Sequence, residues 1–279
     1  MAVVGDVLIN GTPFAPGEAR LSVFDVGLQR GYGCFEAFRA YRGRIFRLGL
    51  HLDRLELSAE RLAIALPRRR DLERWAADRA LAGGDCIVRM FVTGGLDPFN
   101  PGTDNSVIVL AEPLPPPKAS LEIAPLPAPW HPGGSVSELT GAKTLSYGPN
   151  LAASLAARRT GADDALLIGR DGTVLEGPTY SVAWITADRL ETPGIDLGIL
   201  ASITRSVALD VAPSCGLEVV EGSFPLQRVI GADEVMALST LKEVMPVSRV
   251  GDRRFAVGER SAQLAAGFEQ VVRRELALD

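Results

Sequence analysis

The chain has 279 residues, of which 47% are hydrophobic and 23% charged, and its formal net charge is −5. This composition is typical of a globular protein. The three cysteines are too few and too scattered for a disulfide framework, and two histidines are too few to favour a histidine-built metal site. The negative net charge disfavours a protein that binds nucleic acids. No apolar run reaches the ~18 residues of a membrane span and the N-terminus lacks the basic region of a signal peptide, so we expect a cytoplasmic protein.

The first part of the chain predicts a mixture of strands and helices. Residues 3–9 are typical of a strand that enters a hairpin turn at Asn10-Gly11. From Leu48 to Leu66, apolar residues recur at spacings of three and four, which predicts a helix that ends before Pro67. The other elements expected here are strands at 34–41, 86–93 and 106–111 and a helix at 71–82 with Asp71 as its N-cap.

A proline-rich stretch follows, in which eight of the chain's 19 prolines lie between residues 113 and 132. Such a composition indicates a linker, and an edge loop inside one domain is the alternative. We therefore predict a small N-terminal α/β domain at 1–115, a proline-rich linker at 116–132 and a larger β-rich C-terminal domain at 133–279.

The second part of the chain again mixes strands and helices. The expected helices lie at 151–159, at 203–212 with Ser202 or Thr204 near the start, from Pro225, and from Ser261 to the end, and the expected strands at 164–168, 173–176, 180–186, 217–221 and 233–238. Runs of strands without a steady strand–helix alternation favour the α+β class over a doubly wound sheet.

Lysine is scarce, since only three of the 29 basic residues are lysines. Phosphate-binding-loop, dinucleotide-fingerprint, zinc-protease and serine-hydrolase motifs are all missing from the sequence. A lysine can form a Schiff base with a carbonyl compound when it is partly desolvated and held in place. Lys143 suits this role or that of a solvated loop lysine. Lys118, behind three prolines, and Lys242, near a loop, are typical of solvated lysines.

Four blocks in a fixed order resemble the class IV aminotransferases, pyridoxal-phosphate enzymes of fold type IV. The first block contains GYGCFEAFRAY, and the second contains GAKTLSYGPN and, past a turn, the Glu176-Gly177 pair. The third begins ASITR, and in the fourth Thr240 stands six residues before Pro246. The blocks cover residues 25–55, 141–185, 201–212 and 239–247.

The resemblance implies a two-domain fold and a set of residues for pyridoxal 5'-phosphate. Lys143 would carry the cofactor as a Schiff base and move the proton during the reaction. Glu176 would face the pyridine nitrogen and favour its protonated form, which makes the ring an electron sink. The phosphate would be bound and the cofactor side contacted by Arg54, Ile203, Thr204, Thr240 and Tyr147.

The substrate side departs from the family pattern. Tyr180 and Ser181 stand where family members commonly have a small residue and an asparagine. After the strand at 86–93 the chain continues Thr93-Gly94-Gly95 and lacks the arginine that would bind a carboxylate in many D-amino-acid aminotransferases and aminodeoxychorismate lyases. Candidate substrate contacts are Arg30, Tyr32, Glu36, Arg39, Tyr180 and Leu241, and Trp130 and His131 are candidates for the edge of the site.

The resemblance implies transamination in ping-pong order, from an amino acid or primary amine to a 2-oxo acid. Features of the branched-chain members are mixed with features of the D-specific and lyase members, so the donor (L-amino acid, D-amino acid or (R)-amine) stays open. Aminodeoxychorismate lyase, which eliminates pyruvate with the same lysine and cofactor, is the alternative. A pyridoxal-phosphate-binding protein without activity is disfavoured because both Lys143 and Glu176 are present. The family also implies a homodimer.

Overall fold

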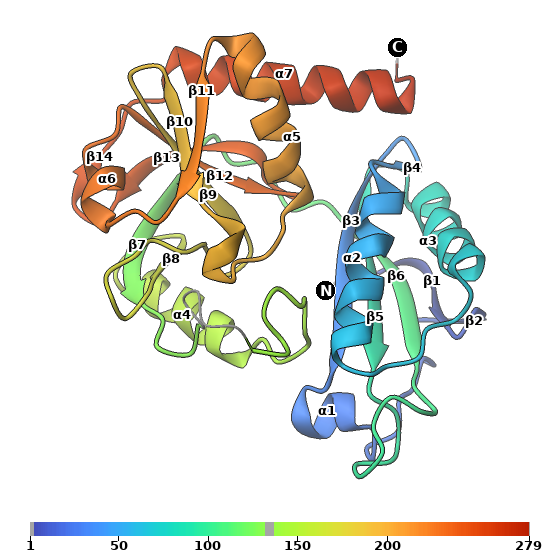
Figure 1. Ribbon diagram of the computed structural model, residues 1–279. Helices are drawn as coiled ribbons and strands as arrows, with labels where there is room; N and C mark the ends of the chain where they lie inside the picture. Colours follow the sequence, from blue (N-terminus) through green and yellow to red (C-terminus); the bar gives the residue numbers. More distant parts are fainter. Residues whose placement is uncertain (1–2, 132–136, 279) are drawn as a thin grey trace. The chain divides into compact units, whose positions relative to one another are not determined.

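The computed structural model describes residues 3–131 and 137–278 and divides the chain into two compact units. Unit 1 comprises Met1–Pro116, Ala142–Tyr147 and Arg273–Asp279. Unit 2 comprises Pro117–Gly141 and Gly148–Val272. Both units are built from helices and strands, as expected for an α+β protein (Figure 1).

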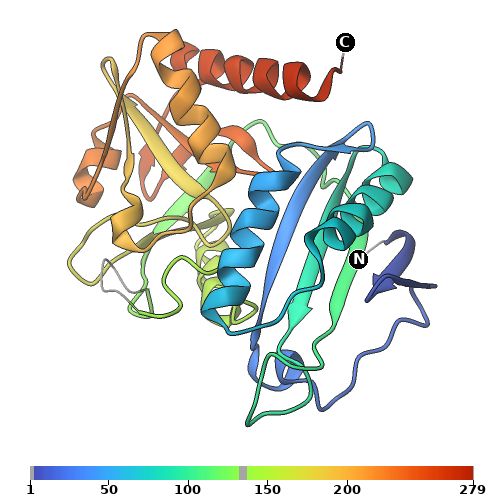
Figure 2. The same ribbon diagram turned by 45° about the vertical axis from the view of Figure 1, so that its right-hand side comes forward.

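Unit 1 contains a six-stranded antiparallel sheet in the order β2-β1-β6-β5-β3-β4. Two long helices lie side by side against this sheet (Figure 2). The strands are β1 (Val4–Ile9), β2 (Thr12–Phe14), β3 (Gly33–Tyr41), β4 (Arg44–Ile45), β5 (Cys86–Thr93) and β6 (Val107–Pro113), and the helices are α1 (Val26–Arg30), α2 (Leu48–Arg61) and α3 (Arg69–Gly83).

The core of unit 1 follows from the alternation of side chains along its strands. In β3, Phe38 and Ala40 are fully buried, whereas Arg39 between them is only half-buried. Phe38 belongs to the same apolar cluster as Leu52 and Leu55 of α2. The face of β3 away from this cluster therefore presents the alternate residues, which include Phe35 and Arg39.

Most predicted elements of unit 1 are confirmed, with corrections at helix ends. The strand at 86–93 has its predicted bounds. Helix α2 ends at Arg61 instead of continuing to Leu66, because the chain turns at Ala63 with a left-handed φ of 50°. Asp71 is not an N-cap: α3 begins at Arg69, and Asp71 lies in its first turn.

Unit 2 contains an eight-stranded mixed sheet with the main order β11-β10-β9-β12-β13-β7-β8, and β14 pairs with β13. Its strands are β7 (Leu121–Pro127), β8 (Asp164–Ile168), β9 (Ser181–Thr186), β10 (Arg189–Pro193), β11 (Glu218–Gly222), β12 (Glu234–Ser239), β13 (Glu243–Val250) and β14 (Arg253–Arg254). The helices are α4 (Gly148–Arg159), η1 (Ile195–Leu197), α5 (Ile203–Val211), η2 (Ala212–Cys215), α6 (Leu226–Ile230) and α7 (Glu259–Leu276).

The predicted linker at 116–132 contains a strand, which is a correction. Strand β7 lies between β13 and β8 and is parallel to both. Its pairing with β13 is confined to Leu121, Glu122 and Ile123, whereas Pro125 and Pro127 pair only with β8. Proline lacks an N–H for the ladder, so it is tolerated where one side of the strand has no partner.

Other differences in unit 2 concern strands that depend on distant partners. Strands β10 and β13 were not predicted, and residues 173–176 form only isolated bridges at Thr173 and Val174 instead of a strand. Helix α4 begins at Gly148, three residues earlier than predicted.

In the described part of the chain, no helix is long and apolar enough to cross a membrane.

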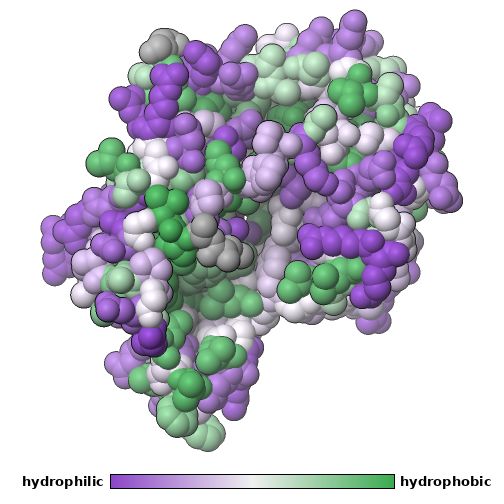
Figure 3. Space-filling model, turned by 180° about the vertical axis from the view of Figure 1, so that it is seen from behind, coloured by the Kyte–Doolittle hydropathy of each residue, from purple (hydrophilic) through white to green (hydrophobic). Residues whose placement is uncertain are grey.

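The end of unit 1 that carries α1 exposes several large apolar side chains. In the space-filling view, green hydrophobic residues gather at the lower projection (Figure 3). The exposed apolar residues of α1, the segment before it and the loop after β5 are Leu21, Val23, Phe24, Leu28, Leu96 and Phe99. Clustered apolar exposure of this kind is typical of a surface that associates with another protein.

Candidate active site

The backbone around Lys143 is fixed to two elements of unit 1. The amide of Phe35 in β3 donates to the carbonyl of Lys143 at 3.0 Å, and Leu145 N donates to Gly33 O at 2.8 Å. The Lys143 amide donates to Ser58 Oγ of α2 at 3.0 Å. The segment is therefore held like an extra short strand beside β3, and these hydrogen bonds fix the backbone position of Lys143.

Two aromatic rings lie close to the Lys143 amine. Its Nζ lies 4.4 Å from the ring centroid of Phe35 and 5.8 Å from that of Tyr147. The two rings meet edge to face at 5.5 Å. Rings at these distances attract an ammonium and also partly desolvate it. This is the setting that a Schiff-base lysine requires, and Tyr147 contributes to it as a wall residue.

Glycine at position 33 permits the close approach of the Lys143 segment. A Cβ at Gly33 would lie 2.3 Å from Val92 O and 2.6 Å from Leu145 Cδ1. Gly31, two residues earlier, ends α1 in the left-handed conformation with φ of 64°. In the Gly31-x-Gly33 pattern, Gly31 therefore ends α1, and Gly33 allows the tight contact of β3 with its neighbours.

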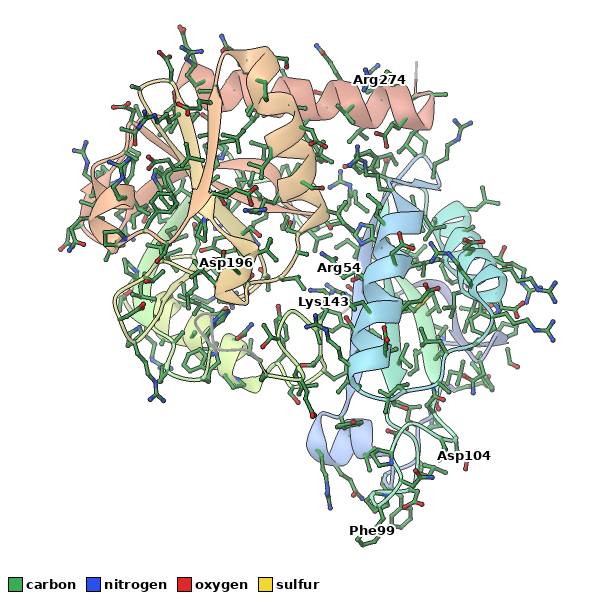
Figure 4. All side chains as sticks on the ribbon, in the orientation of Figure 1. Arg54, Phe99, Asp104, Lys143, Asp196 and Arg274 are labelled. Atoms are coloured by element: carbon green, nitrogen blue, oxygen red, sulfur yellow. The ribbon has the colours of Figure 1, made fainter. Side chains whose placement is uncertain are left out.

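A buried charge network holds Arg54. The Glu36 side chain is fully enclosed and accepts hydrogen bonds from Arg54 Nε at 2.7 Å and from Arg54 Nη2 at 2.8 Å. The ring nitrogen Nδ1 of His51 lies 2.9 Å from the same carboxylate. Two contacts from one guanidinium fix its plane as well as its position. Figure 4 labels Arg54 on α2 and Lys143 on its own segment.

The network shifts the pKa values of its members. Burial by itself raises the pKa of Glu36, but the charge of Arg54 and the hydrogen bonds from His51 and Arg54 lower it to about 2. Burial lowers the pKa of His51, against the opposite influence of Glu36, and the charges of Arg54 and Lys143 lower it further. Burial and the charge of Glu36 raise the pKa of the Cys34 thiol to about 12, so that cysteine is an inert core residue.

In unit 2, Glu176 is anchored beside the start of α5. The amide of Leu200 donates to Glu176 Oε2 at 3.2 Å, and Leu200 lies two residues before the N-cap Ser202. His131 Nε2 lies 3.5 Å from Glu176 Oε1. The carboxylate is therefore oriented from two sides, which suits a group that must face a defined partner.

The start of α5 offers hydrogen-bond donors without partners in the described part of the chain. Ser202 Oγ accepts from the amide of Arg205, and among the described residues no hydrogen bond engages the amides of Ile203 and Thr204. Helix α5 packs against β12 and β13, and Thr240 follows directly after β12. Unbonded N–H groups at a helix start, with threonine hydroxyls nearby, are a ready site for a phosphate.

Several predicted substrate residues have other contacts. Glu36 is enclosed by Arg54 and His51, which favours a positioning role over a substrate contact. Tyr32 donates its hydroxyl to Leu62 O at 2.7 Å. Tyr180 is 4% exposed and donates its hydroxyl to Ala165 O at 2.5 Å. These contacts leave little of Glu36, Tyr32 or Tyr180 available to a substrate.

Tyr180 packs so tightly that its neighbour must be glycine, since a Cβ at Gly177 would lie 2.1 Å from the Tyr180 ring. The remaining predicted substrate residues are more open. Arg30 is exposed at the end of α1, and Leu241 is partly exposed after β12. Arg39 lies with its guanidinium carbon 4.9 Å from the Tyr41 ring centroid. These three stay predictions.

The two other lysines lie in different environments. Lys118 forms an exposed ion pair with Asp163, as expected for a surface lysine. The expectation that Lys242 is solvated is wrong: it is partly buried, and its Nζ donates to Thr179 Oγ1 at 3.1 Å. Burial lowers the pKa of Lys242.

Sequence reasoning missed the residues that support the predicted ones. Ser58 both accepts from the Lys143 amide and donates to Arg54 O at 2.8 Å. His51 reaches Glu36 across the helix–sheet contact. The one available signal was spacing, because His51, Arg54 and Ser58 lie three and four residues apart and share one face of α2.

These features define the class of protein as a two-domain α+β enzyme of fold type IV: the chain forms two compact units, and the Lys143 backbone is held by β3 and α2. The sequence model of the family described as Amino-transferase class IV matches residues 33–250. The chain belongs to this family of aminotransferases.

Known proteins of the family resemble the chain over nearly its whole length. The D-alanine aminotransferase of Listeria innocua is 31% identical and the aminodeoxychorismate lyase of Bacillus subtilis 26% identical; the alignments cover 96% and 97% of this chain and 96% and 94% of those proteins. The structure of the T.th. branched-chain amino acid aminotransferase with pyridoxamine 5'-phosphate has a TM-score of 0.88 and 25% identity, over 96% of this chain and 94% of that one.

Proposed function

We propose that this aminotransferase uses pyridoxal 5'-phosphate and Lys143 to move an amino group from an amino acid or primary amine to a 2-oxo acid, in ping-pong order. The observation that carries the proposal is the fixation of Lys143 by β3 and α2, with its amine close to two aromatic rings. For a solvated loop lysine we would expect neither these backbone hydrogen bonds nor two aromatic rings close to the amine.

The residues that we propose to hold the cofactor offer the groups that its phosphate and its ring nitrogen need. Its phosphate requires cationic and N–H donors, and Arg54 together with the amides of Ile203 and Thr204 are of this kind. Its ring nitrogen requires a carboxylate, which Glu176 supplies. The branched-chain relative in complex with pyridoxamine 5'-phosphate supports the same cofactor.

When bound, pyridoxal phosphate supplies an electron sink that stabilises negative charge on the substrate carbon. The residues of the chain do the rest. Lys143 Nζ would hold the cofactor and, once free, would carry the proton that leaves the substrate carbon. Glu176 would face the ring nitrogen and favour its protonated form. Arg54, held by Glu36, neutralises the phosphate without having to reorganise.

The elimination of pyruvate from aminodeoxychorismate is the second candidate, favoured by the likeness to the lyase relative. Against it stands the segment after β5. Thr93 is buried there and donates its hydroxyl to Asp25 at 2.7 Å, and Gly94 and Gly95 follow. An arginine side chain for a carboxylate is therefore missing from the place where the sequence pattern of many lyases has one.

A half-reaction screen tests the proposal. Purified protein with pyridoxal phosphate is mixed with L- and D-amino acids and (R)- and (S)-amines, and the cofactor absorbance is followed. We expect at least one donor to change the spectrum and a 2-oxo acid to restore it. Pyruvate release from aminodeoxychorismate with no half-reaction by any donor would favour the lyase. A cofactor spectrum that no amine changes would indicate a binding protein without activity.

The partners that we propose are an amino donor, a 2-oxo acid acceptor and a second copy of the chain. The exposed apolar residues around α1 support self-association, because a monomer seldom exposes so many in one place. Sedimentation velocity should give the mass of a homodimer, about twice the 29.7 kDa of the chain. A single species at the mass of one chain would contradict this.

A further inference from the structure

Lys242 of unit 2 lies between two segments that carry predicted site residues. Its Nζ donates to Thr179 Oγ1 at 3.1 Å and stands 5.2 Å from the ring centroid of Tyr180. Its amide donates to Ser239 Oγ at 3.1 Å, which closes the turn between β12 and β13. The side chain therefore spans from the turn of Thr240 to the loop that follows Glu176.

The ammonium of Lys242 has no carboxylate partner among the residues that the structure describes. The charged groups that act on it are Asp164 at the start of β8, which raises its pKa, and Arg158 at the end of α4, which lowers it; burial outweighs both and lowers the pKa. The Asp164 carboxylate is already engaged by Ser154 Oγ at 2.6 Å. A partly buried cation without a counter-ion is unfavourable, and an anionic ligand would neutralise it.

The geometry leaves donor capacity for such a ligand. An ammonium has three N–H donors, and Thr179 accepts one of them. The Tyr180 ring covers one side of the ammonium, while the lysine as a whole stays partly exposed. At least one N–H is thus open to a group arriving from solvent.

We propose that Lys242 binds a carboxylate of the amino donor or of the 2-oxo acid and so selects carboxylated substrates over simple amines. The inference rests on the proposed transaminase function. Among the described residues the Lys242 amine contacts Thr179 and Tyr180, and neither belongs to the start of α5, where the proposed phosphate donors lie. A substrate carboxylate therefore suits it better than the cofactor phosphate, although both are anions.

Steady-state kinetics of Lys242→Met and Lys242→Arg test the inference with three donor types: a simple alkylamine, alanine and glutamate. Loss of a charge-assisted hydrogen bond should lower kcat/KM of Lys242→Met for the carboxylated donors about 10- to 100-fold, with the alkylamine unchanged. Lys242→Arg should recover part of the loss. An effect on glutamate alone would assign the side-chain carboxylate; an effect on both amino acids would assign the α-carboxylate. An equal loss for all three donors, or no loss, would overturn the inference.

Binding of glutarate, a dicarboxylate without an amine, gives a readout independent of turnover. Calorimetry with the pyridoxal-phosphate-loaded protein should show weaker glutarate binding for Lys242→Met and unchanged binding for the control Lys118→Met, which removes an exposed lysine of the same unit. The affinity for pyridoxal phosphate should be the same in all three proteins. A loss confined to pyridoxal phosphate would assign Lys242 to the phosphate and overturn the inference.

The two proposals fail in different ways. If the wild-type protein carries out no half-reaction but binds glutarate through Lys242, the transaminase function fails and the carboxylate site stands. If the wild-type protein transaminates but glutarate binds equally to Lys242→Met, the carboxylate site fails alone. A wild-type protein that binds neither glutarate nor any carboxylated donor also contradicts it.

Discussion

The two units place their charged residues in contrasting environments. In unit 1, Glu36, His51 and Arg54 satisfy one another inside the protein, and the Lys143 backbone is tied to the same helix. In unit 2, the start of α5, Thr240 and Lys242 keep donors that the described protein atoms do not use. The first arrangement prepares geometry before a ligand arrives, and the second keeps binding capacity in reserve. Substitutions in unit 1 should therefore affect stability as well as activity, and those in unit 2 mainly ligand affinity and turnover.

The largest expected effect is that of Lys143→Ala. Removal of the amine should lower transaminase activity about 1,000-fold or more, since the proton carrier is lost. Borohydride treatment of the wild type should fix the cofactor on the peptide containing Lys143, which mass spectrometry can identify among three lysines. Labelling of Lys118 or Lys242 instead would contradict the assignment, and Lys118→Ala is the matched control.

Glu36→Gln should lower the free energy of unfolding, because it disrupts the buried network of Glu36, His51 and Arg54. Removal of one partner from a buried ion pair typically costs about 3–5 kcal/mol, because the remaining charge stays enclosed. The free energy of unfolding should fall by this amount in urea denaturation, and the affinity for pyridoxal phosphate should fall too as Arg54 loses its anchor. Unchanged stability would show that the network does not act as a unit.

The same network should make the protein sensitive to acid. The pKa of Glu36 falls from 4.5 to about 2 on folding, so between these pH values the unfolded chain binds more protons. The stabilisation by Glu36 is thus present above pH 4.5 and is lost as the pH falls toward 2. His51, whose pKa is lowered from 6.5, acts in the same direction below that pH. Denaturation across this range should give a flatter profile for Glu36→Gln.

Glu176→Gln should reduce turnover and leave the fold intact. Loss of the carboxylate should lower kcat about 100-fold, because the ring nitrogen is no longer kept protonated. The protein should still bind pyridoxal phosphate, as judged by absorbance. Glu218→Gln, which breaks an exposed pair with Arg189, is the control and should keep full turnover. Equal turnover in the two variants would remove Glu176 from the mechanism.

Thr240→Val should have the smallest effect. Loss of one hydroxyl donor to a phosphate should weaken pyridoxal-phosphate binding about 10-fold. Thr160→Val, directly after α4, removes an exposed residue's hydroxyl that donates to Ala157 O and is the control. A fluorescence titration with pyridoxal phosphate measures both. A large loss of unfolding free energy in Thr240→Val would contradict the contrast between the two units.

Sequence patterns predicted best where a segment's structure depends on its own residues. Strand 86–93 and strand 164–168 have their predicted bounds, and α5 begins at Ile203 as predicted, with Ser202 as its N-cap. The prolines of β7 concealed a strand, since only its pairing with β8 and β13 makes it part of a sheet. The residues of a strand do not by themselves indicate whether it pairs with one neighbouring strand or with two.

By itself, the sequence determined the α+β class, the family and the single lysine that its blocks single out, because these depend on residue types in order along the chain. The tertiary structure decided what surrounds each residue. It enclosed Glu36 with His51 and Arg54, buried Tyr180 and placed Lys242 over its ring. Burial and pairing come from partners far apart in the chain, brought together by sheet register and helix packing. Whether a charged side chain is solvated, enclosed or left open for a ligand is therefore a property of the fold.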